Sequence, residues 1–159
     1  MRRTIEIALV LAVALAAAPA GAADKYVSLE GKWSLNLKET RYPAGFPKIA
    51  RNDMIVTKDD GTALQFTETM TMDGKDINST WDGAYDGKMR PTSDGQLLAW
   101  HHVSARTAGD ERKNADGVTT GKSVCTVSAG GDKLACRIQT FIPGQKKPIK
   151  FTEIFDKAP

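Results

Sequence analysis

Hydrophobic and polar residues alternate with a period of two along most of the chain after residue 30. The alternation is clearest around Trp33, around Phe66 and around Trp81. Successive side chains of a β-strand point to opposite faces, so this pattern predicts strands with one buried face. No segment in this part of the chain has a helical period. The expected strands lie at 31–38, 52–58, 62–72, 75–86, 88–91, 96–106, 108–114, 118–128, 133–142 and 148–156.

Tight-turn motifs separate the expected strands. Asp-Gly pairs stand at 60–61, 73–74 and 116–117, and a Gly-Gly pair stands at 130–131. These residues tolerate the positive φ that short hairpins require, and consecutive hairpins place neighbouring strands side by side. A single flat sheet of this size would leave two open edges. We therefore predict an all-β fold, an antiparallel up-and-down β-barrel of about 8–10 strands, with a two-sheet sandwich as the alternative.

Two segments between the turns are less regular. Residues 108–114 contain the run Gly-Asp-Glu-Arg-Lys, which suits a solvated loop as well as a strand. Residues 42–47 contain two prolines and a glycine, which prevent a regular element and predict a loop.

The first 23 residues have the features of an export signal. Arg2 and Arg3 precede an apolar run at 7–18, and small residues follow at 20–22. The run is too short to span a bilayer core of roughly 30 Å. We therefore expect 1–23 to be a signal peptide cleaved after Ala22 or Ala23, with no membrane span left. The mature domain, 24–159, would then be periplasmic or secreted.

Composition limits the class of protein without naming a function. The 159 residues suit one domain, and 41% of them are hydrophobic, as in an ordinary globular protein. The formal net charge of +3 is too small to indicate a nucleic-acid-binding surface.

The two cysteines fall on neighbouring expected strands. Cys125 and Cys136 flank a turn centred between Gly130 and Gly131, so they should lie opposite each other across one hairpin. A loop at 129–132 would bring their Cβ atoms close enough for a disulfide, which an exported protein would retain. The alternative is a pair of buried thiols.

Three short motifs carry a resemblance to a known family. The segment Gly-Lys-Trp-Ser-Leu-Asn-Leu at 31–37, the hairpin at 127–134 and the ending Phe-Asp-Lys at 155–157 resemble exported bacterial lipocalin-like proteins. Those are small barrels of the calycin and fatty-acid-binding type, so the resemblance implies a β-barrel. Residues 39–50 are too short and proline-rich for the helix pair of fatty-acid-binding proteins. The C-terminal helix of a typical lipocalin is also missing, so the fatty-acid ligand does not carry over.

A barrel of this size either fills its interior with side chains or holds one small ligand. We expect a small apolar or amphipathic molecule as partner. Glu68 shares the apolar parity of its strand, and His102 and Arg106 share that of theirs, so Glu68 is expected to pair with His102 or Arg106. Such a pair would orient the polar end of a ligand. The expected ligand-binding residues are Trp33, Phe66, Glu68, Met70, Trp81, Tyr85, Trp100, His102 and Arg106.

The sequence contains no motif of a familiar enzyme, metal site or cofactor site. Nucleophile elbows, zinc-protease motifs, phosphate loops and dinucleotide-binding glycine patterns are absent. His101 and His102 point to opposite faces of a strand and would not share a metal. We therefore expect a non-catalytic binding protein without metal or cofactor. The alternatives are a cell-envelope interaction module with a filled barrel, and a barrel isomerase or cyclase that uses Glu68 and His102 as acid and base.

Overall fold

The computed structural model describes residues 26–159, and the expected signal peptide at 1–23 lies outside the described residues. The described part contains ten β-strands and no α-helix, and nothing in it could cross a membrane as a helix. The strands are β1 (Gly31–Leu35), β2 (Ile49–Asp59), β3 (Ala63–Met72), β4 (Lys75–Ala84), β5 (Arg90–Pro91), β6 (Leu97–Ser104), β7 (Thr107–Lys113), β8 (Thr119–Val127), β9 (Lys133–Thr140) and β10 (Ile149–Ala158).

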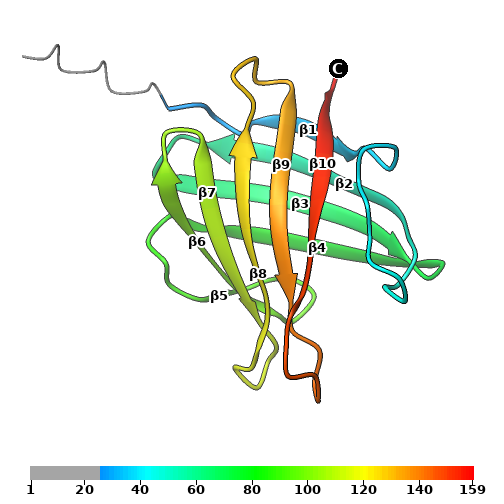
Figure 1. Ribbon diagram of the computed structural model, residues 1–159. Coiled ribbons are helices and arrows are strands. Elements are labelled where there is room, and N and C mark those ends of the chain that lie inside the picture. The colour runs from blue at the N-terminus through cyan, green and yellow to red at the C-terminus, as the bar shows by residue number, and fades with distance from the viewer. Residues whose placement is uncertain (1–25) are drawn as a thin grey trace, which may run out of the picture.

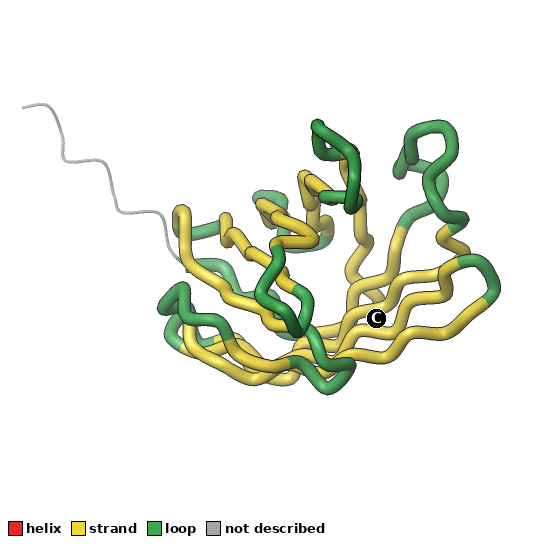
Figure 2. Tube along the Cα trace, turned by 90° about the horizontal axis from the view of Figure 1, so that it is seen from below, coloured by secondary structure: helices red, strands yellow, loops and turns green. Residues whose placement is uncertain are grey.

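All ten strands form one antiparallel sheet in the order β4-β3-β2-β1-β10-β9-β8-β7-β6-β5. Each strand therefore pairs with its neighbours in sequence, except that β4 and β5 do not pair, and β1 joins β10. The sheet curls over so that β2 to β4 run crosswise behind β7 to β10 (Figure 1). Seen from below, the strands surround a common interior (Figure 2). The predicted up-and-down barrel is confirmed, and the sandwich is not formed.

The barrel is nearly closed rather than fully closed. β4 and β5 are the two ends of the sheet, and no ladder of hydrogen bonds joins them. A few local bonds hold this seam: the Ser93 amide donates to the Thr80 carbonyl at 3.1 Å, and Trp81 Nε1 donates to the Leu98 carbonyl at 3.2 Å. The indole of Trp81 thus contributes to closure as well as to the apolar core.

Most strand bounds differ from the expected ones by a few residues, and two segments show why the chain forms or leaves a strand. The first strand ends at Leu35 rather than at residue 38, because Asn36 Oδ1 accepts hydrogen bonds from the Lys38 and Glu39 amides and turns the chain. The ambiguous segment 108–114 is a strand, β7, paired along its length with β6 and β8. Strands β6 and β8 supply backbone hydrogen bonds on both sides of this segment. It is therefore a strand, although its polar sequence suits a loop equally well.

The N-terminal segment before β1 is tied to the barrel by a buried carboxylate. Asp59, at the end of β2, is 3% exposed and accepts hydrogen bonds from the Tyr26 hydroxyl, from the Tyr85 hydroxyl at 3.0 Å and from the Leu29 amide at 2.6 Å. Leu29 in turn accepts a 2.7 Å bond from Nε1 of Trp33, whose side chain is fully buried. These contacts close one end of the barrel core.

The cysteines lie where the turn motif predicted them. Cys125 on β8 is directly opposite Cys136 on β9, with Cα atoms 4.0 Å apart, and the two form a disulfide. The Ser128 amide donates to the Lys133 carbonyl at 2.8 Å, which leaves residues 129–132 as the predicted loop. The disulfide therefore cross-links one hairpin.

Breaking this disulfide is expected to lower the free energy of unfolding by about 3 kcal/mol, since the bond removes closure entropy of a short loop from the unfolded chain. Urea unfolding with and without dithiothreitol measures the effect. The double variant Cys125→Ala/Cys136→Ala serves as the control and should not respond to dithiothreitol. An identical unfolding curve for oxidised and reduced protein would contradict the prediction.

Candidate functional site: an internal cavity with a buried polar cluster

A cavity of about 240 Å³ lies inside the barrel. Strands β2, β3 and β6 to β10 and the loop before β2 all contribute to its wall. The wall is mostly apolar, and the disulfide also faces it. Its main apolar side chains are Met54, Phe66, Met70, Trp100, Ile138 and Phe151.

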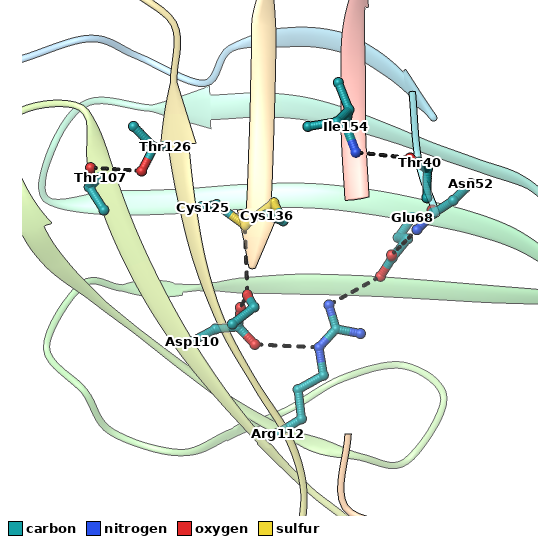
Figure 3. Close-up of a disulfide and its surroundings, with 11 residues drawn as sticks. Thr40, Asn52, Glu68, Thr107, Asp110, Arg112, Cys125, Thr126, Cys136 and Ile154 are labelled. Atoms are coloured by element: carbon teal, nitrogen blue, oxygen red, sulfur yellow. Dashed lines mark hydrogen bonds and ion pairs between the residues drawn. A yellow bond between two sulfur atoms is a disulfide. The ribbon is translucent and has the colours of Figure 1, made fainter. Parts of the chain in front are cut away.

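A polar cluster interrupts the apolar wall and centres on Glu68. Asn52 Nδ2 donates to Glu68 Oε1 at 3.0 Å, and Arg112 Nη2 lies 3.6 Å from Glu68 Oε2. Arg112 Nε lies 3.5 Å from Asp110 Oδ1, and the Ser123 hydroxyl donates to Asp110 Oδ2. Figure 3 shows Glu68, Arg112 and Asp110 as a chain of interactions that ends beside the disulfide. Four different strands thus supply one network.

The register of the sheet explains why these residues meet. On β7, Asp110 lies opposite Trp100, and Arg112 lies opposite Leu98. Because opposed residues point to the same face, Asp110 and Arg112 share the inward face with two buried core residues. On β3, Glu68 lies opposite Met54 of β2, which lines the cavity, and two residues from Phe66, so it points to the same inward face.

A second buried acid lies on β10. Glu153 is 7% exposed, and its Oε1 accepts a 2.7 Å hydrogen bond from the hydroxyl of Tyr42. Tyr42 stands in the proline-rich loop, so this bond ties the loop to the cavity. Its ring is 5.3 Å from that of Phe46, which packs 4.7 Å from Phe151. The loop predicted at 42–47 therefore lies against the cavity.

Burial raises the pKa of two acids in the cavity wall. Loss of solvent raises the pKa of Asp110, and the nearby Arg112 only partly opposes this. Burial likewise raises the pKa of Glu153, against the lowering effect of the Tyr42 hydrogen bond. The carboxylates in turn hold Arg112 charged: Glu68, followed by Asp110, raises the pKa of its guanidinium.

Four of the expected ligand-binding residues line the cavity. They are Phe66, Glu68, Met70 and Trp100. Trp33 and Trp81 are 0% and 3% exposed and belong to the core outside the cavity wall. Assignment of any of these residues to a ligand stays a prediction.

The other three expected residues lie elsewhere. Tyr85, His102 and Arg106 border a narrow hollow of about 10 Å³ near Tyr26. The rings of Tyr85 and His102 stack at 3.9 Å, and His102 Nε2 lies 2.9 Å from the Gly61 carbonyl oxygen.

The expected pair of Glu68 with His102 or Arg106 is not formed. A β-bulge after His102 breaks the alternation, and β6 ends at Ser104, which places Arg106 in the turn. Arg112 takes the role of counter-charge to Glu68 instead.

The sequence reasoning missed most polar residues of the cavity wall, and four of them are Asn52, Asp110, Arg112 and Glu153. A signal for three of them is present in the sequence. Asp110 and Arg112 share the parity of Ala108, and Glu153 stands between Phe151 and Phe155 at the same spacing. Their polar character made solvation the simpler interpretation.

No protein-family model matches the chain, and no curated protein sequence matches it. Among solved structures, a mutant of the fluorescent protein UnaG is similar with a TM-score of 0.54 and 14% sequence identity, over 82% of this chain and 96% of that chain. Such a likeness shows the fold alone. The protein has a calycin-type barrel, the architecture of lipocalins and fatty-acid-binding proteins.

The buried Glu153 should make stability fall as pH rises. The folded state keeps this proton at pH values where the unfolded chain, with a glutamate pKa of about 4.3, has lost it. The contribution is present below the unfolded pKa and is lost as pH rises through the folded pKa. The free energy of unfolding of Glu153→Gln should therefore decline less than that of the wild type between about pH 4 and pH 8.

Glu111 provides a control of opposite sign for this titration. Thr119 Oγ1 donates to its carboxylate at 2.9 Å and lowers its pKa, so its stabilising contribution is lost as pH falls. Urea unfolding of Glu153→Gln, Glu111→Gln and wild type across the same pH range separates the two effects. Parallel curves for Glu153→Gln and wild type would contradict the assignment.

Proposed function

We propose that this protein binds a small hydrophobic or amphipathic molecule inside its barrel. The internal cavity of about 240 Å³ is the observation that carries the proposal. This volume lies just below the roughly 300 Å³ at which drug-sized sites begin, so the ligand is small. A calycin-type barrel is a fold that typically holds small hydrophobic ligands, which supports the same function.

The wall of the cavity suits such a ligand. Met54, Met70 and Met72 contribute flexible thioether side chains that adapt to irregular apolar shapes. Buried polar groups at one place in an apolar wall give a ligand a fixed orientation. The cluster around Glu68 supplies those groups.

The two alternative functions have less support from the geometry. An interaction module with a filled barrel would have no cavity of this size. A barrel isomerase or cyclase would use an acid–base pair, and the Glu68–His102 pair expected for it is not formed.

Filling the cavity should abolish binding of an apolar probe. Met54→Trp places a large ring inside, and we expect at least a tenfold loss of affinity for 1-octanol, about 1.4 kcal/mol, by isothermal titration calorimetry. Ile55→Trp is the matched control, because Ile55 is the next residue on β2 and is 43% exposed on the outer face. Absence of octanol binding to the wild type, or equal binding to both variants, would overturn the proposal.

We also propose export of the protein to the periplasm or the medium. The expected signal peptide at 1–23 and the Cys125–Cys136 disulfide support this location, because disulfides persist in oxidising compartments.

Export predicts that intact-mass spectrometry of protein from the cell-envelope fraction finds a chain that begins after Ala22 or Ala23. The variant Leu11→Arg, with a charge in the apolar run, should keep the segment and stay in the cytoplasm. Recovery of the full-length wild-type chain from the cytoplasm alone would contradict export.

A further inference from the structure

The cavity wall contains more acidic than basic side chains. Glu68, Asp110 and Glu153 face one guanidinium, that of Arg112. Lys122 also borders the cavity, but its ammonium lies 3.6 Å from Glu111 and its side chain is 50% exposed. Among residues 26–159, the cavity wall therefore has three carboxyl groups, and Arg112 is the one cation in contact with them.

Two buried acceptor atoms in the cavity wall lack hydrogen-bond donors among the described residues. They are Asn52 Oδ1 and Asp110 Oδ1, in residues that are 3% and 4% exposed. The orientation of the Asn52 amide is set by its bond to Glu68, since only Nδ2 can donate to that carboxylate. Asp110 Oδ1 has an ion-pair contact with Arg112 but receives no hydrogen bond.

Unpartnered buried acceptors indicate what a ligand must offer. A buried polar atom without a partner is unfavourable, and a ligand that donates a hydrogen bond to it would remove that cost. The third unpartnered atom, Trp100 Nε1, is a donor. Unpartnered acceptor atoms therefore outnumber unpartnered donor atoms in the cavity wall. This imbalance, like the excess of acidic side chains, favours a ligand that donates hydrogen bonds.

A ligand carboxylate fits this cavity poorly. Arg112 is already shared between Glu68 and Asp110, at 3.6 Å and 3.5 Å. A carboxylate head would place a fourth acid among three in a low-dielectric interior, where like charges repel strongly. An ammonium head would instead donate hydrogen bonds to Asn52 Oδ1 and Asp110 Oδ1, which receive none from the described residues.

We propose that the cavity selects an amphipathic amine, with its ammonium group in the cluster of Asn52, Glu68 and Asp110 and its apolar tail against the methionine and phenylalanine side chains. This inference rests on the proposed function and specifies the ligand's chemical class. It gives the barrel a head-group preference opposite to that of a fatty-acid carrier.

Three probes with the same tail and different heads test the preference. Octylamine, 1-octanol and octanoate are titrated into the full chain at neutral pH by isothermal titration calorimetry. We expect octylamine to bind about tenfold more tightly than 1-octanol, and octanoate to bind most weakly, because charge-assisted hydrogen bonds are the stronger ones. Octanoate binding as tightly as octylamine overturns the proposal.

Charge-neutral variants then locate the head group. Glu68→Gln and Asp110→Asn should each reduce the ratio of amine to alcohol affinity about fivefold, as expected when one charged acceptor is lost. Glu111→Gln changes the net charge equally on the outer face of β7 and should keep the wild-type ratio. Thermal unfolding of each variant shows whether it is folded. Two cluster variants are used so that the test still holds if one of them does not fold.

The outcomes separate this inference from the proposed function. Alcohol binding without an amine preference, or an unchanged ratio in both cluster variants, overturns the amine proposal and leaves ligand binding standing. Binding of none of the three probes overturns both.

Discussion

The interior of this barrel depends on one guanidinium among several buried carboxyl groups. Arg112 reaches both Glu68 and Asp110 from β7, and no second cation in the described residues enters the cavity to share that task. Carboxylates removed from water are costly unless a counter-charge or hydrogen bonds compensate them. The contacts of Arg112 with Glu68 and Asp110 therefore stabilise this polar cluster inside an apolar barrel. It also leaves an excess of acceptors that shapes the chemistry of any ligand.

The proline-rich loop before β2 connects this interior to the surface. Tyr42 donates to buried Glu153, while Phe46 packs on Phe151 of the cavity wall. The loop occupies the part of the chain where fatty-acid-binding proteins have a helix pair. The Phe46–Phe151 contact and the hydrogen bond from Tyr42 to Glu153 hold this loop against the cavity wall.

The fold was largely readable from local signals, and the site was not. Trp33, Phe66 and Trp81 marked buried faces by a period of two, and the turn at 129–132 predicted the disulfide partners. For the site, parity along one strand identified Glu68 but named the wrong counter-charge. Arg106 had the right parity only if β6 continued straight, whereas a bulge and a turn end the strand before it. Arg112 lay in a segment whose polarity suited a loop equally well.

By itself, the sequence determined the pairing of most consecutive strands, the hairpin disulfide and the presence of one apolar face on each strand, because these features depend on neighbours in the chain. Only the tertiary structure decided which charges meet inside. Asn52, Glu68, Asp110 and Glu153 come from four strands that are brought together by curling the sheet into a barrel. Their distances depend on register, bulges and the curvature of the whole sheet, which no local pattern of residues specifies.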